Sequence, residues 1–289
     1  MRAVRASVAA TLLLAACEQV RPPSDDAVFV DGSEVGDLRG ANMREASGLT
    51  ASPAHPGAFW LHNDSGNEPE LFLIDATGSA KMRVRVQGAS NRDWEDIAHR
   101  GDTLFIAETG DNGARWDTSY VYAVIEPKSP ADSTAAVVAS FPFQYPDGPR
   151  DAETLLIDPI SGDWFIVTKR EDRSRLYRYP APQRQGVLVT VERMPVDFGF
   201  RLAVGGDVSP DGSEVLVKTY DAVYYWEREA GESLDRALSR PPKQQPYTAE
   251  RQGEALAFAL DGSAYYTTSE VELDVPQFLL RYARKSSPR

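Results

Sequence analysis

The chain has 289 residues, and its 43 Asp and Glu outnumber its 31 Lys and Arg, which gives a formal net charge of −12 at pH 7. This excess of negative charge argues against nucleic acid as a partner and against electrostatic docking of the protein surface on anionic lipid. The single cysteine excludes an internal disulfide bond.

Residues 1–16 have the pattern of a secretory signal peptide. Arg2 and Arg5 precede an apolar run at residues 8–16, and that run is far shorter than the roughly 18–20 residues of a membrane span. A buried N-terminal helix is the alternative interpretation. The pattern therefore predicts export of the protein.

The signal peptide ends in Leu-Ala-Ala-Cys, which resembles the lipobox of bacterial lipoproteins. The resemblance implies that Cys17 carries the lipid and anchors the protein in the cell envelope, at the outer membrane or the periplasmic face. Residues 17–26 are polar and contain two prolines, so we expect a tether between the lipid and the folded domain. The domain itself is expected at residues 27–289.

An acidic residue stands directly before a short apolar run at five places in this domain. The five anchor acids are Glu45, Glu95, Glu153, Asp207 and Glu254, at intervals of 50, 58, 54 and 47 residues. A period near 50 residues with several short strands in each unit is typical of a β-propeller.

The strands expected within each unit follow its anchor acid and are bounded by Gly, Pro, Asp and Asn. Second strands are predicted at 58–64, 102–112, 163–170, 214–220 and 263–270, and third strands at 70–78, 119–127, 175–181, 222–228 and 277–283. Fourth strands are predicted at 81–86, 139–145 and 187–194. The one predicted helix spans 231–240, with Ser233 as its N-cap.

The five anchors favour an all-β propeller of five blades. Six blades would require a degenerate unit in the long interval between Glu95 and Glu153, and an antiparallel sandwich is the alternative fold. Because an open ring would leave unpaired strand edges, we expect the N-terminal strand at residues 27–30 to complete the last unit and close the ring.

First strands of a propeller start on the face where second strands end, so the acids at these points should meet at one mouth of the central channel. The predicted ligands of a bound metal are Glu45, Asp64, Glu95, Asp111, Glu153, Asp207, Glu254 and Glu270. So many negative charges close together repel one another. We expect the carboxylates to be protonated through raised pKa values, paired with cations of the protein, or bound to a metal ion. The alternative is that each anchor acid accepts hydrogen bonds from the backbone of the neighbouring blade.

The compensating groups can be named from the sequence. Lys169, Arg170 and Lys218 follow second strands, and Lys169 and Lys218 are the predicted ligand-binding cations. Calcium is preferred over zinc as the metal, since the chain has three His and its only Cys is in the lipobox.

Seven motifs, in chain order EASGL, HNDSG, WEDIA, ETGDN, DAETLL, GGDVSPDG and QGEALAF, resemble bacterial exported propellers of the phytase-like and SdiA-regulated type, in the TolB-like propeller group. The resemblance spans residues 44–270. It implies a calcium-binding face lined by Glu45, Glu95, Glu153 and Glu254, and phytases of this fold hydrolyse phosphate esters. The chain departs from the pattern at Asp207, where the other units have Glu, and in the small number of basic residues on the face.

These observations predict a lipid-anchored propeller of the cell envelope whose acidic mouth binds a cation and a small ligand or partner. The first alternative is a metal-dependent hydrolase of phosphate esters or lactones, in which His62 or Glu95 would act as acid or base. The second is an interaction platform for another envelope protein.

Overall fold

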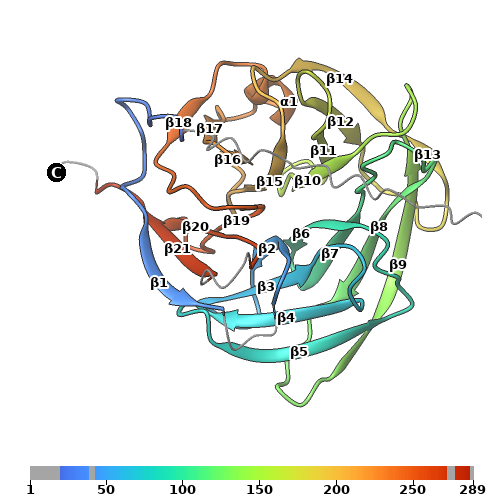
Figure 1. Ribbon diagram of the computed structural model, residues 1–289. Helices are drawn as coiled ribbons and strands as arrows, with labels where there is room; N and C mark the ends of the chain where they lie inside the picture. Colours follow the sequence, from blue (N-terminus) through green and yellow to red (C-terminus); the bar gives the residue numbers. More distant parts are fainter. Residues whose placement is uncertain (1–19, 39–42, 272–276, 287–289) are drawn as a thin grey trace, which may run out of the picture.

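The computed structural model describes residues 20–38, 43–271 and 277–286, and within them the chain forms five four-stranded blades (Figure 1). Blade 1 consists of β2 (Ala46–Ala51), β3 (Ala58–Asn63), β4 (Glu70–Asp75) and β5 (Ala80–Gln87). Blade 2 consists of β6 (Trp94–Arg100), β7 (Thr103–Glu108), β8 (Ser119–Ile125) and β9 (Thr134–Gln144). Blade 3 consists of β10 (Ala152–Ile157), β11 (Trp164–Thr168), β12 (Arg175–Tyr179) and β14 (Glu192–Asp197).

The last two blades complete the ring. Blade 4 consists of β15 (Ala203–Val208), β16 (Glu214–Thr219), β17 (Val223–Glu227) and β18 (Lys243–Gln245). Blade 5 consists of β19 (Ala255–Phe258), β20 (Ala264–Thr268), β21 (Phe278–Ala283) and the N-terminal β1 (Ser33–Asp37). The first strands are neighbours around the axis in the order β2, β6, β10, β15 and β19, and β19 lies beside β2 again. The predicted five-bladed propeller is thereby confirmed.

Burial explains why the inner strands are apolar and the outer strands alternate. Every residue of β2 and β10 is buried, because these strands stand at the axis between two neighbouring blades. In the outer strand β5, buried and exposed residues alternate, since only one of its faces meets the core.

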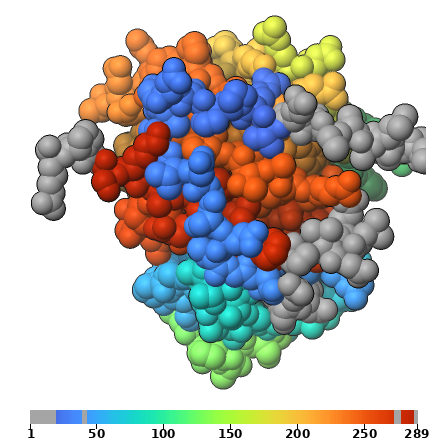
Figure 2. Space-filling view, turned by 60° about the vertical axis from the view of Figure 1, so that its left-hand side comes forward, coloured from blue at the N-terminus to red at the C-terminus, as the bar shows by residue number. Residues whose placement is uncertain are grey.

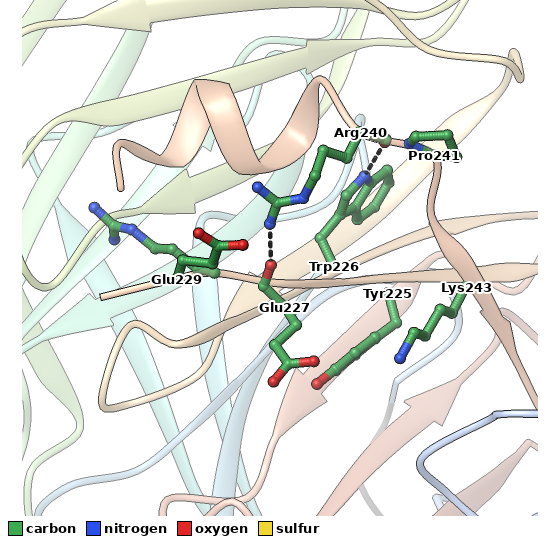
Figure 3. Close-up of a pocket in the computed structure, with 8 residues that line it drawn as sticks. Tyr225, Trp226, Glu227, Glu229, Arg240, Pro241 and Lys243 are labelled. Atoms are coloured by element: carbon green, nitrogen blue, oxygen red, sulfur yellow. Dashed lines mark hydrogen bonds between the residues drawn. The ribbon is translucent and has the colours of Figure 1, made fainter. Parts of the chain in front are cut away.

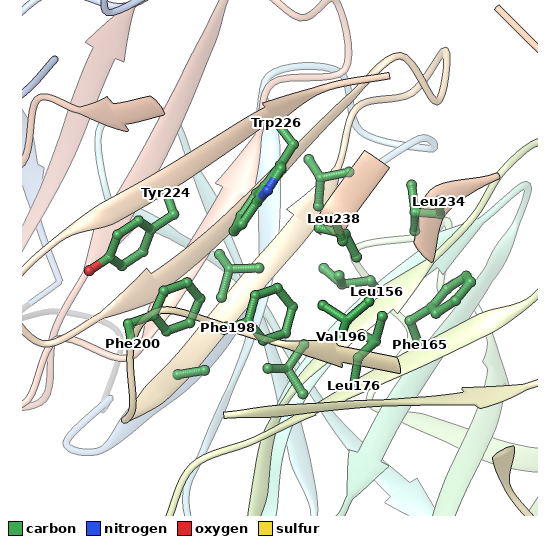
Figure 4. Close-up of a cluster of buried hydrophobic side chains, with 14 of the residues drawn as sticks. Leu156, Phe165, Leu176, Val196, Phe198, Phe200, Tyr224, Trp226, Leu234 and Leu238 are labelled. Atoms are coloured by element: carbon green, nitrogen blue, oxygen red, sulfur yellow. The ribbon is translucent and has the colours of Figure 1, made fainter. Parts of the chain in front are cut away.

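Five clusters of buried side chains fill the spaces between blades, one at each of the five junctions. Figure 4 shows the cluster between blades 3 and 4, where Leu156 and Phe165 meet Phe198 and Trp226. The short helix α1 (Leu234–Leu238) adds Leu234 and Leu238 to this cluster. The helix lies within the predicted span, and Ser233 is at the N-cap position, although its side chain makes no capping hydrogen bond.

The junction between blades 1 and 2 has an additional feature. The start of β9 pairs in parallel with the end of β5, from Arg85 opposite Thr134 to Gln87 opposite Ala136. Backbone hydrogen bonds therefore join these two blades into one continuous sheet. The two-residue strand β13 (Val189–Thr190), which was predicted to belong to a single fourth strand with β14, pairs with the other end of β9.

The N-terminal segment closes the ring, but the closing strand is not the predicted one. β1 pairs antiparallel with β21, from Ser33 opposite Arg281 to Asp37 opposite Phe278. Residues 27–30 contribute an isolated bridge from Phe29 to Arg284 and a buried phenyl ring instead of a strand. The prediction chose residues 27–30 because they are apolar. Their Phe29 side chain fills the core, whereas the more polar β1 covers the edge of β21.

The predicted tether is also largely bound to the domain. Arg21 and Ser24 donate backbone hydrogen bonds to Asp221 and Gln244 of blade 4, each at 2.9 Å. Residues 20–26 are therefore docked on the propeller, while Cys17 and the predicted signal peptide lie outside the described residues. No helix in the described part of the chain is long and apolar enough to cross a membrane.

Candidate cation site at the mouth

The inner strands start with a β-bulge in four of the five blades, and the bulge decides which side chains reach the axis. The bulged residues are Ser47, Glu95, Glu153 and Val204. A bulge re-aims the side chain of the extra residue. Glu95 and Glu153 are thus equivalent, whereas the matching positions in blades 1 and 4 carry Ser47 and Val204 rather than the predicted anchors Glu45 and Asp207.

Six carboxylates meet at the mouth, and we call them the carboxylate cluster: Asp64, Asp93, Glu95, Glu153, Glu254 and Glu270. Three overlapping groups have ligand oxygens within 4.8 Å of one another: Glu95 with Glu153 and Glu254, Asp64 with Asp93 and Glu95, and Asp64 with Glu254 and Glu270. Five of the eight predicted metal ligands are therefore together, and Asp93 was missed. Its position two residues before Glu95 was the available signal.

Asp207 does not belong to the carboxylate cluster, which corrects that prediction. Its carboxylate accepts hydrogen bonds from the backbone N–H groups of Val208 and Phe258, both at 2.8 Å. Asp96 likewise accepts from Ile97 and Leu155, at 2.8 Å each. Asp207 thus connects blade 4 to blade 5, and Asp96 connects blade 2 to blade 3. This is the role that the alternative hypothesis gave to the anchor acids.

Glu45 and Asp111 lie at the mouth but outside the groups of close carboxylates among the described residues. Glu45 is exposed and accepts a hydrogen bond from the Asn67 amide. Asp111 accepts from the backbone N–H groups of Arg115 and Trp116, at 2.5 and 2.6 Å, so that its carboxylate shapes the loop between β7 and β8. Their predicted place among the metal ligands is corrected accordingly.

Lys169 supplies positive charge to one side of the cluster. Its ammonium pairs with Glu153 and lies 3.3 Å from Glu254 Oε1. Burial opposes the charged form, but the two glutamates prevail and raise the pKa of Lys169. Tyr220, which the sequence reading missed, donates its hydroxyl to Glu254 and presents its ring 5.2 Å from the Lys169 ammonium.

Lys218 is turned away from the cluster. Its ammonium donates to the Gly253 carbonyl, lies 3.6 Å from Glu250 and sits over the Tyr247 ring. The side chain is fully buried, and burial lowers its pKa. Lys169 is therefore the predicted lysine that the fold brings to the carboxylates, whereas Lys218 neutralises Glu250.

Glu95 has no compensating partner. The residue is 2% exposed, and no described side chain or backbone group donates a hydrogen bond to its carboxylate. Burial, followed by the charges of Glu153 and Asp64, raises the pKa of Glu95 well above its ordinary value. The second oxygen of Glu153 also lacks a hydrogen-bond partner, and burial raises the pKa of that residue as well.

The outer part of the cluster is reachable from solvent, because Asp64 and Glu270 are only partly buried. Burial and the neighbouring carboxylates raise the pKa of Asp64 to about 7 and that of Glu270 to about 8. Gly110 makes room for the inner part, since a Cβ atom there would lie 2.0 Å from Glu95 Oε1 and 2.5 Å from Asp93 Cγ.

His62, a candidate acid or base, is enclosed by protein. Its ring is fully buried, meets the Trp94 ring edge-on at 5.6 Å, and contacts the Asn63 carbonyl at 3.1 Å through Nδ1. Burial lowers the pKa of His62 to about 4, so the imidazole is neutral at pH 7. It has no exposed surface to offer a substrate.

A separate hollow lies at the outer edge of blade 4, beside β17 and β18 (Figure 3). This cavity of about 340 Å³ is lined by Tyr225, Glu227, Arg240 and Lys243, among others. Arg240 already donates to the Glu227 carbonyl, and the Trp226 indole donates to the Arg240 carbonyl. None of the anchor acids lines it, and its polar groups stabilise the connection that carries α1.

No protein-family model matches the chain, and no curated protein matches it in sequence.

Proposed function

We propose that this protein is a lipid-anchored β-propeller of the cell envelope whose carboxylate cluster binds a divalent cation, Ca²⁺ in preference to Zn²⁺, together with a small ligand or partner. The unpaired Glu95 carboxylate carries the proposal. A buried carboxylate without a donor or a cation is costly. Glu95 must therefore hold a proton or face a cation that enters through the mouth.

The chemistry of the donors supports Ca²⁺. Each member of the carboxylate cluster offers carboxylate oxygen, the ligand type that Ca²⁺ prefers. Lys169 neutralises only the side near Glu153 and Glu254. Asp64, Asp93 and Glu95 form the group to which the described structure brings no lysine, and these three residues would hold the ion.

Calcium titration of the metal-free protein tests the proposal. At a hundredfold excess over Kd, an ion that binds only the folded state adds roughly 2.7 kcal/mol of stability, which raises Tm by roughly 5–10 °C in a domain of this size. Glu95→Gln should remove this rise. Glu68→Gln is the matched control, because Glu68 is an exposed acid on the same face, outside the cluster. A wild-type Tm that ignores Ca²⁺ would refute the proposal.

The hydrolase alternative loses one of its two candidate groups, because His62 is enclosed. Glu95 is the other, and it would have to activate water beside the bound ion. Hydrolysis of a phosphate monoester or a lactone by the Ca²⁺-loaded protein, absent in Glu95→Gln, would favour this alternative. The platform alternative is less supported, since Trp116 is the one exposed large aromatic side chain among the described residues.

A further inference from the structure

The described chain starts on the face of the propeller that carries the carboxylate cluster. The Arg21 backbone N–H donates to the Asp221 carbonyl at 2.9 Å, and the Arg21 guanidinium lies 2.6 Å from the Asp221 carboxylate. Tyr220, the residue next to Asp221, donates its hydroxyl to Glu254 of the cluster. The start of the docked segment therefore lies on the mouth face, which we define as the face where first strands begin and second strands end.

The path of this segment is fixed along its length. From Arg21 it passes Ser24, which is bonded to Gln244 of β18, and reaches Phe29, which is bridged to Arg284 toward the opposite face. It then returns as β1. Figure 2 shows the N-terminal residues, in blue, crossing the orange and red surface of blades 4 and 5. The end nearest Cys17 is thus the end at the mouth.

Only three residue steps separate Cys17 from Val20, and three steps of fully extended chain span at most about 10 Å. An acyl group on Cys17 would therefore leave the protein close to the mouth face. We infer that the mouth face lies against the phospholipid headgroups of the membrane that holds the anchor, so that the carboxylate cluster opens toward the lipid surface. This inference rests on the proposed lipidation of Cys17.

Side chains of the mouth face suit a headgroup layer. Four of the blades contribute an exposed arginine to their connections on this face: Arg44, Arg115, Arg173 and Arg201. Trp116, which is 46% exposed, lies on the same face and stacks with the Arg92 guanidinium at 4.8 Å. Tryptophan and arginine are both favoured where apolar surface meets polar headgroups.

The attachment itself would come from the acyl chains. Exposed carboxylates such as Glu68 and Asp117 accompany the arginines on the mouth face, so the face is not a basic patch. The arginines would donate hydrogen bonds to lipid phosphates once the anchor has set the orientation. Binding should accordingly resist high salt, unlike adsorption that depends on net charge.

Quenching of Trp116 by a lipid with a headgroup spin label tests the orientation. The other four tryptophans are buried, so Trp116→Phe removes the exposed reporter. Ile160 is 63% exposed in the turn between β10 and β11, on the opposite face. The Trp116→Phe, Ile160→Trp double variant therefore moves the reporter to that face. The wild-type protein and both tryptophan variants are produced as full chains, purified from membranes and reconstituted into phosphatidylglycerol-containing vesicles.

Wild-type protein should be quenched several-fold more strongly than either variant. Quenching of the double variant but not of the wild type, or equal quenching of all three vesicle-bound proteins, would overturn the orientation while leaving the anchor intact. Protein that never enters the membrane fraction would refute the anchor, and the orientation with it. Cys17→Ser distinguishes these cases, because it should abolish both membrane association and quenching.

Discussion

Asp64 and Glu270 make the stability of the metal-free protein depend on pH. Their pKa values of about 7 and about 8 in the fold exceed the ordinary carboxylate values, so the folded state retains protons that the unfolded state has released. The stability linked to these groups is present at low pH and is lost as the pH rises through their folded-state pKa values. His62 has the opposite effect. Because its pKa is lowered in the fold, its contribution to stability is lost as the pH falls below 6.5, its ordinary pKa.

We expect Tm of the Ca²⁺-free protein to fall between pH 6.5 and pH 8. Saturating Ca²⁺ should reduce this fall, since the ion stabilises the ionised carboxylates. Differential scanning calorimetry across this range measures both effects. The Asp64→Asn, Glu270→Gln variant should show a flatter pH profile without Ca²⁺. A Tm that rises over the same range in wild-type protein would contradict the assigned protonation.

Gly110 gives a second test at the scale of one residue. An added Cβ would overlap the Glu95 and Asp93 carboxylates, so Gly110→Ala should lower stability by about 1–3 kcal/mol and weaken Ca²⁺ binding. Gly199→Ala is the matched control, because a Cβ there meets no atom within 4 Å. Equal Tm values and calcium affinities for the two variants would show that the cluster is not held against Gly110.

Single residues also show where the sequence was insufficient. Glu95, Glu153 and Glu254 were predicted together because each precedes an apolar strand at the repeat period, and all three belong to the carboxylate cluster. Asp207 fits the same period, but the bulge in β15 lies between Ala203 and Gly205, so the aspartate is further along its strand. A bulge shifts the side chains that follow it, and the apolar pattern does not report its position.

Among the elements, β1 decides whether the ring is closed. A Cβ on Gly36 would lie 1.6 Å from the Thr77 carbonyl oxygen in the turn between β4 and β5. Gly36→Ala should therefore displace β1 from β21, lower Tm and reduce the hydrogen-exchange protection of β21. Ser33→Ala, at the exposed start of the same strand, should leave both nearly unchanged. Unaltered protection of β21 in Gly36→Ala would mean that β1 is not needed to hold that edge.

The inner and middle strands of each blade were predictable, whereas the outer strands were less so. Inner strands are buried on both sides, so their sequences are apolar runs. In contrast, the outer strand β18 has the sequence KQQ, and the outer strand β1 has SEVGD. These outer strands pair on one side only and contact water, so burial places little demand on their side chains. The closing strand was therefore sought in the more apolar residues 27–30.

At the scale of the whole molecule, the repeat period was sufficient to predict the propeller. A unit near 50 residues provides four short strands and their turns, and five units close the ring once β1 is paired with β21. The orientation that we infer for the mouth relative to the membrane could not be predicted from the repeat pattern. It depends on where the segment from Val20 to Phe29 docks, and that is determined by hydrogen bonds to blade 4 and a bridge to the residue after β21.

The parallel pairing of β5 with β9 makes the five junctions mechanically unequal. Strand pairing joins β9 of blade 2 to β5 of blade 1 and to the short β13 of blade 3, whereas no strand pairs across the other three junctions within the described residues. A molecule stretched by its two ends in an optical trap should first lose β1 from β21 and then shed blades 5 and 4. Blades 1, 2 and 3, which β9 links, should rupture last, in an extension step larger than that of a single blade.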